Sequence, residues 1–395
     1  MPDLHDATAD WTYLDHAAAT PLDDTVRTAM EPFLTAQFYN PSATYAPARE
    51  VARSLLAART SVAHWLGARP AEVIFTAGGT ESDNLAIRGT MDNLIKQYAD
   101  ANLVVSAIEH EAVLRPAGQY DCRLAPVDGQ GVVDLDALRG LIDGKTVLVS
   151  IMYANNEIGT VQPLREVSRL LQTVRDERRR AGNARPLLLH SDACQAANYM
   201  DMHAARMGAD MITINGGKLY GPKQSGVLYV RGGLVLQPQV LGGGQEYGLR
   251  SGTENIAGAV GLATALELAQ NTRRMEAARL QELQQLFLEH VTAQLPATRV
   301  NGSLKKRLPN NVHITLTGHD NERLILELEA RGVLAAAGSA CSASSGEPSH
   351  VLRAIGLSDD EARASLRFTM GRSTSEHDVR RCVAALADIV DDDRS

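Results

Sequence analysis

The segment Met211-Ile212-Thr213-Ile214-Asn215-Gly216-Gly217-Lys218 reads as a short buried strand that ends in glycines and a lysine. An earlier apolar run, Leu187-Leu188-Leu189, leads in the same way into Asp192. In an open sheet of parallel strands, ligands bind at the carboxyl ends, where side chains from neighbouring strands meet. We therefore expect the Lys218 amine and the Asp192 carboxylate to share one site.

The rest of the chain alternates between strand and helix patterns. Short apolar runs predict strands at Val73–Thr76, Leu103–Ser106, Thr146–Met152 and Val227–Val230, and helical spacing predicts helices that include 51–66, 85–98, 164–180 and 199–207. This alternation is typical of an α/β fold with a mostly parallel sheet flanked by helices. From Glu254 the pattern changes to long helices as far as about Gln294, then a strand at Asn311–Leu316 and a last helix from about Glu376.

A further segment, Thr76-Ala77-Gly78-Gly79-Thr80-Glu81-Ser82, lies between a predicted strand and a predicted helix. Its glycines, hydroxyls and free helix N–H groups suit a phosphate, although such turns often need glycine and a hydroxyl cap for structural reasons alone. A lysine, a carboxylate and a phosphate cup at one sheet edge are what pyridoxal 5'-phosphate requires. The amine forms a Schiff base, the carboxylate keeps the ring nitrogen protonated, and the cup binds the phosphate. The segments together therefore predict a pyridoxal 5'-phosphate site.

Composition limits the partners and the compartment. The 395 residues carry 39 Lys and Arg against 47 Asp and Glu, a net charge of −8, which argues against nucleic acid as a direct partner. No run approaches the ~18 apolar residues of a membrane-spanning helix, and the acidic start, Met1–Trp11, is unlike a targeting signal. The four cysteines lie far apart, without the spacing of a disulfide framework or a zinc site. We expect a cytoplasmic protein with no metal centre and no membrane partner.

One cysteine has unusual surroundings. The segment Leu334–Pro348 reads LAAAGSACSASSGEP, which offers almost nothing to bury and predicts an exposed loop around Cys341. A free thiol in such a loop can reach a substrate as a thiolate nucleophile. Cys194 and Cys382 lie on strand-end and helix patterns and are interpreted as small core residues, and Cys122 is undecided.

Nearly end to end, the chain resembles cysteine desulfurases of the NifS/IscS type, which are fold-type I, class V aminotransferase-like enzymes that depend on pyridoxal phosphate. The residues that carry this resemblance are, in chain order, Tyr13–Pro21 (YLDHAAATP), Asn40-Pro41-Ser42, Gly78–Asn84, Glu109-His110, Asn155–Gly159 (NNEIG), Asp192–Gln195, Lys218–Pro222, Gly242-Gly243-Gly244, Arg250-Ser251-Gly252-Thr253, Gly338-Ser339-Ala340-Cys341 and Arg367-Phe368. The length of the Cys341 loop resembles the long-loop branch of the family.

The resemblance implies a large cofactor-binding domain over residues 21–259. A smaller α+β domain, made of residues 1–20 and 260–395, would carry the Cys341 loop. The implied reaction converts L-cysteine to L-alanine, leaves a persulfide on Cys341 and passes the sulfur to an acceptor protein. That acceptor stays open among an iron–sulfur scaffold, a tRNA-thiolation protein and a DNA-modification system. A homodimer is also implied, with Thr253 reaching the phosphate bound by a second subunit.

The site residues follow from the same resemblance. Lys218, Cys341 and His110 would be catalytic, with His110 stacked on the cofactor ring and active in proton transfer; a core imidazole is the plain alternative for His110. Arg367 and Asn40 would bind the substrate carboxylate. Asp192 would pair with the ring nitrogen, and Gln195 and Asn156 would bond the ring hydroxyl. The full cofactor-binding set would be Gly79, Thr80, His110, Asn156, Asp192, Gln195, Asn215, Gly217, Lys218 and Thr253.

Three features depart from the family pattern. Gly217 replaces a common histidine before the lysine, which removes a contact near the phosphate and should loosen the backbone, with an effect on cofactor affinity. Tyr247 stands where arginine is usual, and the sequence ends at Ser395 without the extended tail that IscS-type members use to dock an iron–sulfur scaffold.

Two other functions stay open. A selenocysteine lyase or an aminotransferase could use the same scaffold, and neither would make Cys341 indispensable for the turnover of cysteine. A degenerate, non-catalytic sulfur-carrier subunit is the other alternative, suggested by Gly217.

Overall fold

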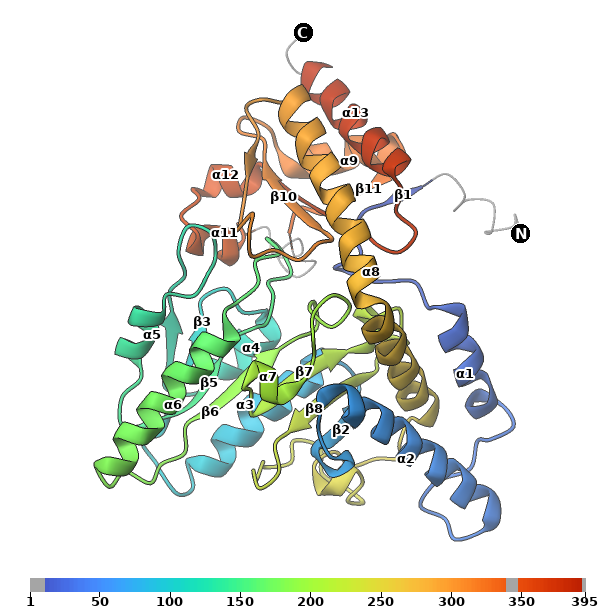
Figure 1. The fold of residues 1–395 in the computed structure, drawn as a ribbon, viewed down its shortest axis with the longest axis vertical. Helices are drawn as coiled ribbons and strands as arrows, with labels where there is room; N and C mark the ends of the chain where they lie inside the picture. Colours follow the sequence, from blue (N-terminus) through green and yellow to red (C-terminus); the bar gives the residue numbers. More distant parts are fainter. Residues whose placement is uncertain (1–10, 339–346, 393–395) are drawn as a thin grey trace.

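The larger part of the chain is built on one seven-stranded sheet (Figure 1). The computed structural model describes residues 11–338 and 347–392. The strand order is β2-β8-β7-β6-β5-β3-β4, where the strands are β2 (Val73–Thr76), β3 (Asn102–Ser106), β4 (Cys122–Ala125), β5 (Thr146–Ser150), β6 (Leu188–Asp192), β7 (Met211–Asn215) and β8 (Gly226–Val230). β8 runs antiparallel to both of its neighbours, and the other pairs are parallel. The predicted mostly parallel sheet is confirmed.

Both faces of this sheet are buried, because successive side chains of a strand point to opposite faces. On β7, Met211 packs in the core under α3, whereas its neighbour Ile212 packs in the core on the other face. The same alternation separates Leu188 from Leu189 on β6. Helices α3 (Gly79–Leu94) and α4 (Glu111–Ala117) cover the first face, and α2 (Ala46–Leu66), α6 (Leu164–Arg180) and α7 (Ala204–Met207) contribute to the core of the second.

Two helix ends test the sequence patterns. Gly67, which ends α2, adopts a left-handed φ of 61°, and a Cβ there would lie 2.1 Å from the His203 ring, so this position requires glycine. The helix predicted at 199–207 is shorter than expected, because only Ala204–Met207 is helical. The Asp201 carboxylate accepts the His203 N–H and forms a turn in place of the first helical residues. The remaining helices of this part are α1 (Asp24–Leu34) and α5 (Leu135–Leu141).

The smaller part has two short sheets. One has the antiparallel order β12-β10-β9, and the other pairs β1 with β11 in parallel. Its elements are β1 (Thr12–Tyr13), β9 (Arg299–Val300), β10 (Asn311–Thr315), β11 (Val333–Leu334), β12 (Ser365–Thr369), α9 (Asn321–Ala330), α11 (His350–Ala354), α12 (Asp359–Arg363) and α13 (Glu376–Asp392). The expected strand at Asn311–Leu316 and the last helix are both present.

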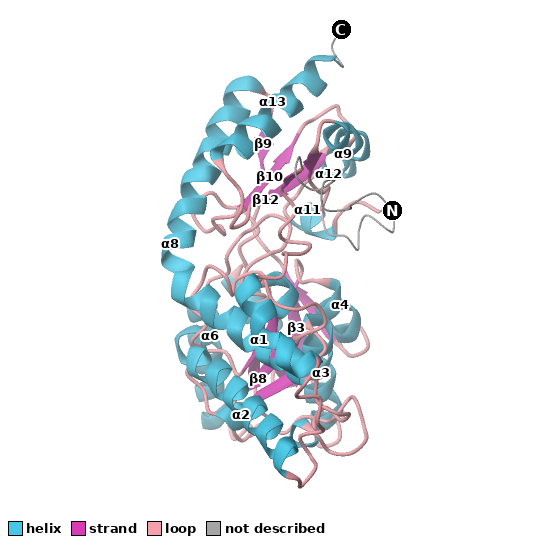
Figure 2. Cartoon of the chain, turned by 90° about the vertical axis from the view of Figure 1, so that its right-hand side faces the viewer, coloured by secondary structure: helices cyan, strands magenta, loops and turns pink. Residues whose placement is uncertain are grey.

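A single long helix, α8 (Ile256–Gln294), joins the two parts (Figure 2). Its buried residues from Ile256 to Ala269 belong to the core of the larger part, and those from Leu280 to Val291 belong to the core of the smaller part. The division predicted after residue 259 therefore falls inside this helix, and it stays a prediction. β1 also belongs to the smaller part, and Asp15 still bridges Thr369 of β12, so the chain crosses to the larger part only after Asp15.

Candidate active site

Lys218 lies in a 3-10 turn, Gly216–Lys218, that directly follows β7. Its carbonyl oxygen accepts a hydrogen bond from Nδ2 of Asn198 at 2.6 Å, and its Nζ donates to the carbonyl oxygens of Ala17, at 2.7 Å, and Ala18. Burial lowers the pKa of the Lys218 amine below its ordinary value of 10.5, so the amine loses its proton more easily.

Asp192 ends the neighbouring strand β6, where its Cα pairs with that of Thr213 on β7. Its Oδ1 accepts the backbone N–H of Cys194 at 2.9 Å. Asp192 and Lys218 line one cavity of about 180 Å³, so the two strand ends meet as expected. The other predicted site residues that line this cavity are Gly79, Thr80, His110, Asn156, Gln195, Asn215 and Arg367.

The N-terminus of α3 opens into the same cavity. Gly78, just before the helix, has a φ of 135°, and within the described residues no side chain caps the helix. A Cβ on Gly79 would lie 2.8 Å from Sγ of Cys194 and 3.5 Å from Nδ2 of Asn215, so the missing side chain keeps this corner open. Free N–H groups at a helix N-terminus attract anions, and this cradle therefore fits a phosphate.

The backbone at Gly217 is held on both sides. Its N–H donates to Oδ1 of Asn215 at 3.0 Å, and its carbonyl accepts from N and Oγ1 of Thr20 at 3.2 and 3.1 Å. None of these three hydrogen bonds needs a side chain at residue 217, and the expected effect of the missing histidine on cofactor affinity stays a prediction. Gly217 does not line the cavity itself, whereas Asn215 does.

His110 is the N-cap of α4, and its Nδ1 accepts the Ala112 N–H at 3.1 Å. An accepting Nδ1 leaves the proton of a neutral ring on Nε2. The ring is half-buried and lines the cavity, so it is open to a bound molecule rather than enclosed in the core.

Arg367 comes from β12 of the smaller part. Its guanidinium is buried and donates to Oδ1 of Asp15 at 2.6 Å and to the carbonyl of Asn156 at 2.9 Å; among the described residues, Nε has no partner. A buried cation with an unused N–H suits a substrate carboxylate. Asn40 is exposed and does not line the cavity, and its Oδ1 accepts the Ser42 N–H instead. Within one chain, the predicted pair of Arg367 and Asn40 is therefore not brought together.

Two acidic residues were missed by the sequence reasoning. Asp83 lines the cavity from α3, and burial, followed by the nearby Asp192 carboxylate, raises its pKa well above the ordinary value. It lies one helical turn after Gly79, so the i, i+4 spacing could have placed it on the cavity face. Asp15, which pairs with Arg367, is 352 positions away from it in the sequence, and no sequence signal links the two.

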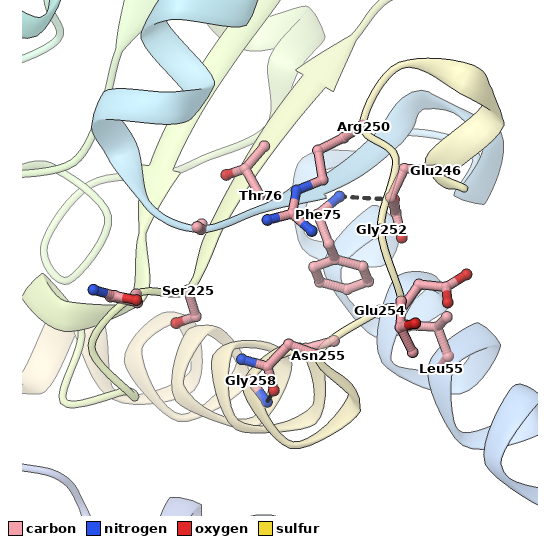
Figure 3. Close-up of a pocket in the computed structure, with 15 residues that line it drawn as sticks. Leu55, Phe75, Thr76, Ser225, Glu246, Arg250, Gly252, Glu254, Asn255 and Gly258 are labelled. Atoms are coloured by element: carbon pink, nitrogen blue, oxygen red, sulfur yellow. Dashed lines mark hydrogen bonds between the residues drawn. The ribbon is translucent and has the colours of Figure 1, made fainter. Parts of the chain in front are cut away.

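Thr253 is exposed and lines a different cavity, of about 230 Å³ (Figure 3). The single chain thus does not bring it to Lys218, and its predicted contact needs a second subunit. Cys341 lies outside the described residues. No helix within 11–338 and 347–392 is long and apolar enough to cross a membrane, and the same residues contain no group of metal-ligating side chains.

The three described cysteines differ in place but share one electrostatic effect. Burial raises the pKa of Cys122 to about 11 and raises the pKa of Cys382 further. Burial, followed by the Asp192 carboxylate, raises the pKa of Cys194 well above its ordinary value. Cys382 is a core residue as predicted, whereas Cys194 lines the cavity beside Asp192. All three are protonated thiols at neutral pH.

Comparison with known proteins places these features in a family. The sequence pattern of the family "Aminotransferase class-V" matches residues 12–382. The chain belongs to the aminotransferase class-V family. It is 38% identical over 384 residues to the cysteine desulfurase IscS of Dictyoglomus turgidum. The aligned region covers 96% of this chain and 94% of that protein. The predicted resemblance to cysteine desulfurases is confirmed.

Solved structures agree with this class-V assignment. A NifS-like protein superposes with a TM-score of 0.88 and is 29% identical, with coverage of 96% of this chain and 99% of its own. SspA in complex with cysteine gives a TM-score of 0.77 and 33% identity, with coverage of 91% and 98%. The fold-type I architecture expected from the sequence is confirmed.

Pyridoxal 5'-phosphate is the cofactor of this class-V enzyme, and the cavity fits it. The uncapped α3 N-terminus with its Gly79 cradle suits the phosphate, and Lys218 and Asp192 supply the amine and the carboxylate.

Proposed function

We propose that this class-V enzyme is a cysteine desulfurase that converts L-cysteine to L-alanine and transfers the sulfur to Cys341. The observation that carries the proposal is one cavity in which Lys218, Asp192 and Arg367 converge, in a chain similar to desulfurases along nearly its whole length. SspA, a structural neighbour, was solved in complex with cysteine.

Different residues around the cavity bind the cofactor phosphate, the cofactor ring and the substrate carboxylate. Gly79, Thr80 and Asn215 hold the phosphate, with Gly217 fixing the Asn215 amide through its N–H. Asp192 would pair with the ring nitrogen, and Gln195 and Asn156, which line the same cavity, would bond the ring hydroxyl. Arg367, whose guanidinium lines the cavity, binds the substrate carboxylate. When bound at Lys218, pyridoxal 5'-phosphate supplies an electron sink for the bonds at the substrate Cα and Cβ.

Proton transfer falls to two residues. Burial lowers the pKa of Lys218, so its neutral amine can take the Cα proton. His110 presents the nitrogen that carries its proton, because Nδ1 is occupied by the Ala112 N–H, and so it can protonate the alanine carbon or relay the proton of the substrate thiol.

The sulfur step balances without an outside oxidant. The Cys341 thiolate attacks the sulfur of cysteine, an S–S bond forms, and the Cβ–S bond breaks with its electron pair left on carbon. A proton then completes the methyl group of alanine, so one cysteine and one thiol give one alanine and one persulfide.

The other cysteines support Cys341 as the acceptor thiol. Burial raises the pKa values of Cys122, Cys194 and Cys382, and a protonated thiol is a poor nucleophile. The persulfide would pass to an acceptor protein, for which iron–sulfur cluster biogenesis is one use. The three unpaired thiols suit a reducing compartment, and we place the enzyme in the cytoplasm.

We also propose a homodimer with composite sites. Thr253 is exposed and away from its own Lys218 cavity, and exposed apolar side chains gather on and between α1 and α2, namely Leu34, Phe38, Tyr45 and Leu56. A two-fold interface above about 1,600 Å² would cover such side chains and bring Thr253 to the partner's phosphate.

Replacing the thiol tests the proposed reaction directly. Cys341→Ser should keep the visible absorbance of the bound cofactor, its change on addition of L-cysteine, and the melting temperature. It should lose alanine formation, because a neutral hydroxyl is a very poor nucleophile toward sulfur. Mass spectrometry of the wild type after a cysteine pulse should place ~32 mass units, one sulfur atom, on the Cys341 peptide alone.

The half-buried Cys122 offers a matched control. Cys122→Ala should form alanine at the wild-type rate. An active Cys341→Ser enzyme, or a persulfide on another cysteine, would contradict the desulfurase mechanism and favour a lyase or an aminotransferase.

A further inference from the structure

The loop Gly242–Thr253, which lines the cavity of Figure 3, has an uncommon backbone. Glu246 and Tyr247 both have a positive φ, of 47° and 58°, between Gly244 and Gly248. Residues other than glycine seldom adopt this left-handed conformation, and they keep it only where the surroundings fix them. Contacts outside the loop must therefore hold it in this one form.

A buried ion pair supplies those contacts. Nη1 and Nη2 of Arg59, on α2, donate to the two carboxylate oxygens of Glu246 at 2.7 and 2.6 Å, and these side chains are only 7% and 3% exposed. Glu246 also accepts the Phe75 N–H of β2 at 2.9 Å, the dashed line in Figure 3. Arg59 donates to the Val73 carbonyl at 2.6 Å as well. A bidentate pair has a fixed geometry, and moving either partner would leave a buried charge unpaired.

Two further contacts tie the loop to its surroundings. The Tyr247 ring lies 5.2 Å from the Arg59 guanidinium, in the range of a cation–π contact. Nε of Arg250 lies 2.9 Å from Oε1 of Glu81, in the first turn of α3. The loop is thus attached both to β2 and to the helix whose N-terminus forms the phosphate cradle.

We propose that the Arg59–Glu246 pair is a positioning element for Thr253. It holds the loop in the conformation from which Thr253 reaches the cofactor phosphate of a second subunit. The inference rests on the proposed function, because it requires a dimer with composite sites. Glu246 touches no residue of the Lys218 cavity, so any effect on the partner's cofactor passes through the loop.

Heterodimers separate this role from a purely structural one. One chain carries Lys218→Ala and cannot attach the cofactor covalently, while the other chain keeps Lys218. Glu246→Gln is added to the Lys218→Ala chain, and pyridoxal 5'-phosphate is titrated against the intact site by its visible absorbance. The dissociation constant should rise about tenfold or more, as for the loss of one hydrogen bond to a charged group. Adding Thr253→Ala to the same chain should raise it no further.

The exposed pair of Glu50 and Arg53, also on α2, gives a matched control. Glu50→Gln on the Lys218→Ala chain should leave the dissociation constant unchanged. If Thr253→Ala raises the constant but Glu246→Gln does not, or if their effects add, the positioning role is wrong and the composite site stands. If neither raises it, the composite site itself is wrong.

A second variant covers the case in which Glu246→Gln does not fold. Arg250→Gln breaks the pair with Glu81, which is partly exposed. It therefore disturbs the same loop without leaving a deeply buried charge unpaired. It should raise the partner site's dissociation constant by a smaller factor, again without adding to Thr253→Ala. An unchanged constant, or an additive effect, would overturn the proposal.

Discussion

The two ends of the Lys218 cavity are built differently. The ring end is defined as Asp192 and Asp83, together with His190, which is buried beside Asp83 and does not line the cavity; these residues come from β6 and α3. The substrate end is defined as Arg367 of β12, which lines the cavity, and its ion-pair partner Asp15, which follows β1 and does not line the cavity. The first belongs to the larger part alone, whereas Arg367 of the second also donates to the Asn156 carbonyl of the larger part, so the second lies where the two parts of the chain meet.

Their electrostatics are opposite as well. At the ring end, Oδ1 of Asp83 is buried without a partner, 3.6 Å from Nε2 of His190. At the substrate end, Nε–H of Arg367 is buried without a partner. The Asp192 carboxylate at one end and the Arg367 guanidinium at the other suit a ligand with a protonated ring nitrogen and a carboxylate. The cavity is therefore polarised along its length, with carboxyl groups at the ring end and a guanidinium at the substrate end.

The largest effect should come from the ring end. Asp192→Asn should still bind pyridoxal 5'-phosphate but lose the charge that keeps the ring nitrogen protonated. We expect alanine formation to fall roughly 100- to 1,000-fold, the range seen when one preorganised electrostatic contact is removed from an active site. Steady-state alanine release at saturating cofactor measures this.

Asp83→Asn sharpens that prediction within the same end. Burial, followed by the Asp192 carboxylate, raises the pKa of Asp83, which favours its protonated carboxyl, and asparagine resembles that form. The rate of alanine formation should fall about tenfold at most. Equal losses in Asp83→Asn and Asp192→Asn would erase the distinction between the two carboxyl groups.

A smaller effect is expected at the substrate end. Arg367→Lys keeps the positive charge but removes the planar fork that serves Asp15, Asn156 and the substrate together. kcat/KM for L-cysteine should fall about 10- to 100-fold, mainly through KM, because the lost contact binds the substrate carboxylate.

Arg372→Lys provides the comparison for that variant. Arg372 lies beyond the end of β12 and pairs with Asp23, outside the cavity. Arg372→Lys should therefore leave KM for L-cysteine unchanged. A wild-type KM in Arg367→Lys would remove the substrate carboxylate from this end of the cavity.

The ring end could be predicted from the sequence far better than the substrate end. Lys218 and Asp192 follow apolar runs on neighbouring parallel strands, so simple strand-end reasoning placed them together. The strands β5 to β8 and the cap at Gly67 followed from hydrophobic runs and glycine in the same way. These are short-range patterns, and local sequence carries them.

The substrate end depends on contacts that local sequence does not carry. Arg367 was assigned from the family resemblance alone, and Asp15 was not assigned at all, because their pairing joins the two ends of the chain. Asn40 shows the limit of the resemblance, since a single chain leaves it exposed and outside the cavity. The place of Cys194 at the cavity, beside Asp192, was also missed, because a small core residue and a cavity residue look alike in sequence.

The smallest predicted effect is on stability and compares a histidine from each end. Burial lowers the pKa of His16, next to Asp15, and of His190, at the ring end, to about 4. His190 has hydroxyl partners for both ring nitrogens, Ser150 and Thr213, whereas within the described residues no side chain bonds either ring nitrogen of His16. In each case the folded state favours the neutral ring, while the unfolded chain takes up a proton below its pKa of about 6.5. Stability is therefore lost as pH falls from about 6.5 toward 4.

Replacing His16 isolates its share of that acid sensitivity. A folded pKa of about 4 against an unfolded value of about 6.5 makes His16 cost about 2 kcal/mol of unfolding free energy between pH 7.5 and pH 5. His16→Phe should remove this loss, because the phenyl ring packs against Tyr13 in the same place without titrating. Urea unfolding at both pH values, at one protein and cofactor concentration, measures the difference. His64→Phe, at an exposed position, should keep the wild-type difference. An undiminished pH effect in His16→Phe would mean that the acid sensitivity comes from the ring end.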